Sequence, residues 1–202
     1  MISIIILGVL ALVVTLGLAK PLVKDFGIPA IVLILAHIAV IGLNFIVAIN
    51  WGAFTFSIGT LVFYVFALAM FVVGKNGKGA IVAFMSALIL GGLVYCGIMV
   101  SKLINFGFMA ENNFAYAIIV GILAVIFTKN GKFSFIVPAE AMMVVAVLSQ
   151  IGQGGFDLNV GFDWTMVAVL TGSVVYLVAQ YIFMAKPDGK MAYYFEAGKL
   201  ES

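Results

Sequence analysis

Glu140 is the residue whose type and position bear most directly on chemistry, because it lies inside the apolar run Ile136-Val137-Pro138-Ala139-Glu140-Ala141-Met142. A charged carboxylate in hydrocarbon costs about 3 kcal/mol on insertion scales, so it must face other helices, a water-filled cavity or a partner chain. Pro138 removes a backbone hydrogen bond beside it and can bend the helix. A kink next to an acidic residue is typical of transport sites. The alternative is that Glu140 lies about one turn from the cytoplasmic interface and simply reaches water.

His37 and Asn44 are two further polar residues within an apolar run, and His37 is the single histidine of the chain. They are seven residues apart, which places them on one face of a helix about two turns apart. This stripe could line a pathway, with His37 as a proton relay or ligand contact, because imidazole titrates near neutrality. The alternative is that both form hydrogen bonds between helices, which contribute about 0.6 kcal/mol per contact in membranes.

The other residue types exclude several classes of function. One His and one Glu in apolar runs do not supply the three or four ligands of a metal site, so we expect no metal and no cofactor. The sequence has no Gly-rich phosphate loop, no nucleophile elbow and no paired carboxylates, which argues against an enzyme. The basic residues are ten Lys and no Arg, whereas nucleic-acid sites favour Arg, so we expect no nucleic-acid partner.

Membrane helices are the elements that must position these residues. The apolar fraction of the chain is 65% and the charged fraction only 9%. A soluble domain is nearer half apolar and about a quarter charged. The apolar runs are continuous and about 20 residues long, which indicates helices rather than the short alternating strands of a membrane barrel.

The chain is therefore predicted to be an all-α, polytopic transmembrane helix bundle with about seven spans, six being the alternative count. The predicted spans are Ile2–Ala19, Ile28–Ile49, Phe54–Val73, Ala80–Val100, Phe114–Thr128, Phe133–Ile151 and Trp164–Ala185. Residues 1–185 form the predicted transmembrane domain, and residues 186–202 a short cytoplasmic C-terminal tail. The first run has no positively charged residues before it, so we expect a retained span and not a cleaved signal peptide. Residues 20–25 and 152–163 are predicted polar loops.

The lysines are distributed unevenly over the predicted connections. The connections that follow the first, third, fifth and seventh spans hold Lys20, Lys24, Lys75, Lys78, Lys129, Lys132, Lys186 and Lys190. The opposite side holds Lys102 alone. Because positively charged loops stay in the cytoplasm, the N-terminus is predicted outside and the C-terminus inside. Trp51 and Trp164 then fall at outer ends, where an aromatic belt is expected.

The tetrapeptide Lys-Asn-Gly-Lys occurs twice, at residues 75–78 and 129–132, each time between two predicted spans of matching direction. Turn chemistry explains this repetition, since Asn-Gly suits a tight turn and Lys suits the cytoplasm. The alternative is a duplicated helical hairpin, related by an axis along the membrane normal.

The stretch from His37 to the Gly/Lys turn at 74–79 resembles part of a known family. Its elements are His37-Ile38-Ala39-Val40-Ile41, Asn44-Phe45-Ile46-Val47 and Trp51-Gly52-Ala53-Phe54-Thr55-Phe56, followed by an apolar span and that turn. This order is similar to the queuosine-precursor transporters of the vitamin uptake transporter family, which are small polytopic carriers of deazapurine bases. The resemblance covers about 45 residues. That family has acidic residues in the span after the aromatic-Gly motif, whereas Phe63–Val73 of this chain has none. The family's later Arg-Asn and Ser-Thr motif is also missing from this chain. No binding residue is carried over from the resemblance.

Two functions of different classes follow from these features. The first is a transporter or channel for a small polar solute, with Glu140, His37 and Asn44 as ligand-binding residues or a proton pathway. The second is a non-catalytic membrane subunit or accessory protein of a larger membrane complex, which the scarcity of polar groups favours; an intramembrane enzyme is a more remote alternative. The expected partners are the lipid bilayer, a small polar solute, and a second copy of the chain or other membrane subunits. The expected location is the cytoplasmic (inner) membrane of a bacterium, with the gene carried by the bacterium or by a phage.

Overall fold

The computed structural model describes residues 2–46, 48–73, 77–105, 114–151 and 153–184. Its chain is 81% helical, so the prediction of an essentially all-helical protein is confirmed. The helices are α1 (Ile2–Thr15), α2 (Lys20–Phe26), α3 (Ala30–Ile46), α4 (Ile58–Val72), α5 (Gly77–Leu103), α7 (Phe114–Thr128), α8 (Gly131–Gln150) and α9 (Phe162–Met184). The strands are β1 (Ala48–Trp51), β2 (Phe54–Ser57) and β3 (Phe156–Asp157).

Three helices, α5, α8 and α9, are long and apolar enough to cross a membrane. Taken together, α1 and α2 are also long and apolar enough, although the chain bends by 95° between them. If this bent pair is one span, the number of such crossings is four. The helices α3, α4 and α7 are apolar but shorter. These lengths support a helical membrane protein, whereas a count of seven crossings stays a prediction.

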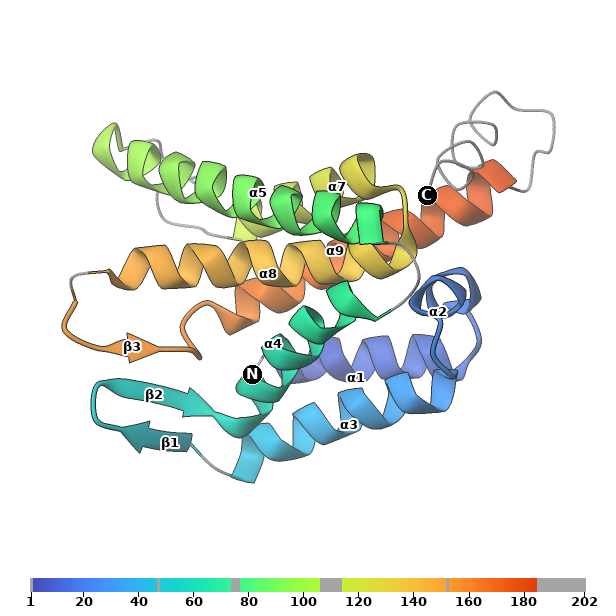
Figure 1. Cartoon of the computed structure of the whole chain (residues 1–202), viewed down its shortest axis with the longest axis horizontal. Coiled ribbons are helices and arrows are strands. Elements are labelled where there is room, and N and C mark those ends of the chain that lie inside the picture. The colour runs from blue at the N-terminus through green and yellow to red at the C-terminus, as the bar shows by residue number, and fades with distance from the viewer. Residues whose placement is uncertain (1, 47, 74–76, 106–113, 152, 185–202) are drawn as a thin grey trace.

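The long helices run roughly along one axis, and successive ones point in alternate directions (Figure 1). The three strands lie together at the left of that view, and α2 lies at the opposite end. We call these the sheet end and the α2 end. Lys102, at the end of α5, belongs to the sheet end, whereas Lys20, Lys24, Lys78 and Lys129 belong to the α2 end. Lys75, Lys186 and Lys190 lie outside the described residues. The tail at 186–202 and part of the first Lys-Asn-Gly-Lys turn also lie outside them.

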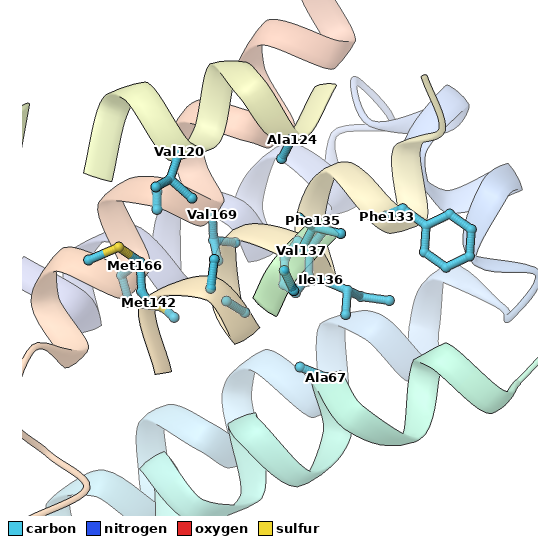
Figure 2. Close-up of a cluster of buried hydrophobic side chains, with 14 of the residues drawn as sticks. Ala67, Val120, Ala124, Phe133, Phe135, Ile136, Val137, Met142, Met166 and Val169 are labelled. Atoms are coloured by element: carbon cyan, nitrogen blue, oxygen red, sulfur yellow. The ribbon is translucent and has the colours of Figure 1, made fainter. Parts of the chain in front are cut away.

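Helix α8 occupies the centre of the bundle (Figure 1). Every residue from Gly131 to Met142 is buried, which means that neighbouring elements cover the helix on all sides there. Figure 2 shows buried side chains of α8 lying among those of α4, α7 and α9: Phe133, Phe135, Ile136, Val137 and Met142 beside Ala67, Val120, Ala124, Met166 and Val169. By contrast, α5 exposes Ile81, Val82, Met85 and Leu93, as expected of a helix with a lipid-facing side. The bundle therefore has an enclosed central helix and an apolar outer surface.

Pro138 lies inside α8 and leaves the Ser134 carbonyl without the usual intrahelical donor four residues later. Gly172 of α9 lies against that carbonyl and against the Pro138 ring, where an added Cβ would collide. The missing side chain at Gly172 therefore lets α9 approach α8 at the point where proline frees a carbonyl group. The backbone hydrogen bond predicted to be lost at Pro138, near Glu140, is therefore found where α8 and α9 pack closely together.

Two predicted boundaries are wrong. Residues 20–25, predicted as a polar loop, belong to the helix α2, which has Pro21 in its first turn. Gly27, in the left-handed conformation with φ 67°, caps its C-terminal end. Leu22 and Phe26 are buried on its inner side. Packing of these two apolar side chains, rather than length or hydropathy, accounts for a helix of only seven residues.

The second error concerns the spans predicted at Ile28–Ile49 and Phe54–Val73. Helix α3 ends at Ile46 and α4 begins at Ile58, and the intervening residues form the antiparallel hairpin β1–β2. Trp51 pairs with Phe54 across a two-residue turn that begins at Gly52, whose φ of 60° favours glycine. Strand β3, within the predicted loop 152–163, pairs in parallel with β2.

Candidate functional site

A cavity of about 470 Å³ opens at the sheet end of the bundle. Its polar lining comes from the starts of α1, α4 and α9, the end of α3 and the β3–α9 connection: Ser3, Asn44, Ser57, Thr60, Asn159 and Asp163. Phe162 and Trp164 add aromatic surface. We call this the polar cavity. Its volume lies in the range of small-molecule sites, about 300 to 1,000 Å³.

Asn44 is fixed at the wall of the polar cavity by several hydrogen bonds. Its Nδ2 donates to the Val40 carbonyl at 3.0 Å, and its Oδ1 accepts from the hydroxyls of Ser57 and of Thr60, the latter at 3.1 Å. Ser57 also caps α4, because its Oγ accepts from the Thr60 backbone N–H at 3.2 Å. The predicted site residue Asn44 therefore belongs to a pre-organised cluster that joins α3 to the start of α4.

Other residues that line the polar cavity are also held by hydrogen bonds. The Ser57 backbone N–H donates to Asn159 Oδ1 at 2.8 Å. The Ser3 backbone N–H donates to Asp163 Oδ1, also at 2.8 Å, so the start of α1 is held to the start of α9. These bonds hold polar groups from four segments around one space.

The polar groups continue from the cavity into the bundle along α4. Tyr64 follows Thr60 by one helical turn, and its hydroxyl lies 2.9 Å from Thr165 Oγ1 of α9. Thr165 donates its own hydroxyl proton to the Gly161 carbonyl at 3.1 Å, so Tyr64 is the donor in the pair. Tyr64 and Thr165 are both buried, and Tyr64 lies within electrostatic range of Glu140.

Glu140 lies near the middle of α8 with 3% of its surface exposed. It lies nine residues after the start of the helix, about 13 Å along the axis. Its Oε1 is buried and has no hydrogen-bond partner within the described ranges. Lys132, on the same helix, instead donates to the Val73 carbonyl at 2.5 Å. Glu140 does not line the polar cavity.

His37 lies deeper in the bundle than Asn44 and does not line the polar cavity. Its Nδ1 lies 2.7 Å from the Leu33 carbonyl, and its ring forms a T-shaped pair with the Phe135 ring at a centroid distance of 5.9 Å. The imidazole borders two small, mainly apolar cavities of about 20 and 70 Å³. The structure thus brings Asn44 into a site with other polar residues, whereas His37 and Glu140 stand apart from that site and do not share the polar cavity.

A row of buried polar residues along α9 was not predicted from the sequence. Four of its members are buried along one helix face, namely Thr165, Ser173, Tyr176 and Gln180. Their spacings of eight, three and four residues fit one side of a helix, which is the signal that could have revealed them. The cavity residues Ser57, Thr60, Asn159 and Asp163 were also missed, because each lies near a predicted span end, where polar residues are ordinary.

Among the residues that the structure describes, no group of three or more His, Cys, Asp or Glu side chains could hold a metal ion. No protein-family model, no curated protein and no solved structure matches the chain. The similarity to queuosine-precursor transporters therefore rests on the stretch from residue 37 to residue 79 alone.

Proposed function

We propose that this chain is a transporter or channel for a small polar solute. The polar cavity carries the proposal, because it combines a volume of about 470 Å³ with amide, hydroxyl and carboxylate groups that are already hydrogen-bonded into position. A site whose polar groups are fixed before binding loses little freedom when a solute enters. The solute class that fits is small and able to donate and accept hydrogen bonds, with aromatic side chains available to contact its faces.

Proton coupling through Glu140 is the second part of the proposal. A carboxyl group in the membrane requires protonation, water or a partner to offset the loss of hydration. The Tyr64–Thr165 pair supports a role in transport, because it extends the polar groups of the cavity to the neighbourhood of Glu140. A carboxyl group that gains and loses a proton there would couple solute movement to a proton gradient.

The membrane arrangement that goes with this function has seven crossings, with the sheet end outside and the α2 end in the cytoplasm. The lysines at the α2 end support that orientation. The polar cavity would then open to the outside of the cytoplasmic (inner) membrane. The exposed Trp51 of the hairpin would lie at the outer interface, where tryptophan is favoured.

Purified protein in liposomes tests the function. The liposomes contain the pH-sensitive dye pyranine and carry an inside-negative potassium diffusion potential, and small neutral or cationic polar solutes are added outside one at a time. We expect at least one solute to accelerate internal acidification in the wild type. The Glu140→Gln variant keeps the shape and hydrogen bonding of the side chain but cannot titrate, and should abolish this effect while folding normally.

Asp157→Asn is the matched control, because it removes a carboxylate near the sheet end whose Oδ1 accepts from the Asn159 backbone N–H at 2.9 Å, a bond that Asn can replace. This variant should transport at the wild-type rate. If wild-type liposomes acidify no faster than protein-free ones with every solute, proton-coupled transport by this chain is refuted. Full activity in Glu140→Gln would refute the coupling role alone.

The competing function is a non-catalytic subunit of a larger membrane complex. The buried Gln180 favours it, because neither Nε2 nor Oε1 of its amide has a hydrogen-bond partner in the described part of the chain. Mild detergent extraction from native membranes discriminates the two functions. A carrier purifies alone or as a homo-oligomer, whereas a subunit co-purifies with stoichiometric amounts of other membrane proteins.

A further inference from the structure

We infer that a second cavity, between α5 and α8 at the sheet end, binds the acidic head and part of one chain of a membrane lipid. This cavity has a volume of about 300 Å³ and shares Gly161 and Trp164 with the polar cavity. We call it the amphipathic cleft. Because α5 and α8 are both long enough to cross a membrane, their ends at the cleft lie near the membrane surface.

The inner end of the amphipathic cleft is closed by a close contact between the two helices. A Cβ at Gly91 of α5 would lie 2.6 Å from the Ala141 carbonyl oxygen of α8, so the helices touch at this level. The lining begins just beyond that contact, at Tyr95 on α5 and at Met142 on α8. The cleft therefore extends from inside the bundle towards the sheet end.

The lining of the amphipathic cleft changes from apolar to polar in the same direction. The part nearer the closed end is mainly apolar and consists of Tyr95, Ile98, Met99, Met142, Val145 and Ala146. The part nearer the end of both helices is polar and consists of Lys102, Ser149, Gln150 and Gln153. A membrane lipid has the same order, since its head lies at the surface and its chains lie in the hydrocarbon core.

Lys102 determines the charge of the head that fits. It is the one charged group among the described residues that line the cleft, and it is exposed. Its ammonium has no hydrogen bond or ion pair within the described residues. The nearby amides are already bonded: Gln150 pairs with both backbone groups of Asp157. Gln153 Nε2 donates to the Ser149 carbonyl at 2.7 Å. An ammonium available beside bonded amides favours an oxyanion, such as a phosphate or a carboxylate.

The surroundings of the cleft favour a lipid as the source of this oxyanion. Met99 lines the cleft with 42% of its surface exposed, and the apolar side chains of Leu103 and Ile151, next along the chain to lining residues, are also exposed. Helix α5 lies at the outside of the bundle (Figure 1). Apolar surface there attracts an acyl chain, whereas a small hydrated anion gains nothing from it. The remainder of the lipid would stay in the bilayer.

Fluorescence quenching by brominated lipids tests the amphipathic cleft. Trp164 lines it, and Trp51→Phe leaves Trp164 as the single tryptophan of the chain. This protein is placed in phosphatidylcholine nanodiscs that contain increasing fractions of either chain-brominated phosphatidylglycerol, which is acidic, or equally brominated phosphatidylcholine. We expect half-maximal quenching at an at least threefold lower fraction of the brominated phosphatidylglycerol, because its head is attracted to Lys102.

Lys102→Gln in the same background removes the charge and should abolish the threefold preference. Lys78→Gln is the matched control, because Lys78 is exposed at the opposite end of the same helix. It should keep the preference. Equal quenching by the two lipids before the lysine is changed would overturn the site. An unchanged preference in Lys102→Gln would overturn the assignment of the head to this residue.

Soluble competitors distinguish a lipid from a free anion. Decanoate carries both an acidic head and an apolar chain, and should reduce quenching by brominated phosphatidylglycerol. Inorganic phosphate at equal ionic strength should leave it unchanged, and displacement by phosphate as effective as that by decanoate would overturn the lipid assignment. The measurement requires no transport. A protein that fails the liposome assay but keeps the lipid preference would therefore lose its proposed proton-coupled transport and retain the lipid site.

Discussion

The Asp25 carboxylate of α2 accepts a hydrogen bond of 2.5 Å from the hydroxyl of Tyr176, 151 residues away on α9. The same oxygen, Oδ2, accepts from the Gly131 backbone N–H at 2.7 Å, at the start of α8. The N-terminus of a helix favours a negative charge. A single carboxylate therefore fastens the short helix α2 to two long helices and closes the bundle at that end.

Removal of the Tyr176 hydroxyl should weaken this attachment. Hydrogen bonds to a charged group contribute about 1.5 to 3 kcal/mol, so Tyr176→Phe should lower the free energy of unfolding by roughly that amount. Reversible unfolding in mixed micelles measures it. Tyr181→Phe is the control, because its hydroxyl bonds the Leu18 carbonyl at an exposed position and should lose about 1 kcal/mol or less. Equal losses in the two variants would contradict the special role of Asp25.

Two adjacent glycines of α5 should respond in opposite directions to alanine. A Cβ at Gly91 would lie 2.6 Å from the Ala141 carbonyl oxygen of α8, so Gly91→Ala must push the two helices apart and should cost about 1 to 3 kcal/mol of stability. A Cβ at Gly92 meets nothing within 4 Å, and alanine there should gain up to about 1 kcal/mol from helix propensity. Thermal unfolding in detergent compares them, and a destabilised Gly92→Ala would show that its face is covered.

The proposed orientation can be measured with single cysteines in a Cys96→Ser background. A membrane-impermeant maleimide added outside intact cells should label a cysteine at Gly155, near β3, but not one at Lys78, at the start of α5. Both positions are exposed in the bundle and lie at opposite ends. Permeabilised cells provide the control, because both sites should then react. Labelling of Lys78→Cys alone would reverse the topology.

Asn44 should be needed for solute binding. Asn44→Ala removes the shared acceptor of the Ser57 and Thr60 hydroxyls at the cavity wall. We expect the solute concentration for half-maximal acidification to rise at least tenfold. Asn50→Ala, which removes an exposed bond to Thr55 on the hairpin, is the control and should leave it unchanged. An unaltered concentration dependence in Asn44→Ala would remove the polar cavity as the binding site.

The helices of the bundle could largely be predicted because hydropathy follows them closely. The predicted span Phe114–Thr128 coincides with α7 at both ends. Hydropathy did not predict the short helix α2, because its stability comes from burying Leu22 and Phe26 against helices distant in sequence. The hairpin was missed for a different reason: Ile49 and Phe54 are apolar, so they were assigned to the ends of two spans, although they belong to β1 and β2.

The site could be predicted only in part. Glu140 and Asn44 stood out because each is polar within an apolar run. The residues around them could not be predicted, because the partners in each contact are far apart in the chain. Tyr64 and Thr165 are 101 residues apart, and Ser57 and Asn159 are 102 apart. Which helix faces meet depends on close contacts such as Gly172 against Ser134, and hydropathy contains no information about them. The duplication of the Lys-Asn-Gly-Lys hairpin stays a prediction.

The enclosure of α8 has a consequence for the biosynthesis of the protein. A helix leaving the translocon meets lipid before it meets any element that is synthesised later, and α9 follows α8 in the chain. Alone in lipid, α8 would expose Glu140 at its centre, which costs about 3 kcal/mol on insertion scales. We therefore expect α8 to enter the membrane only in company with α5 and α7. A nascent chain arrested after Gln150 should stay bound to the insertion machinery, and completion of α9 should release it.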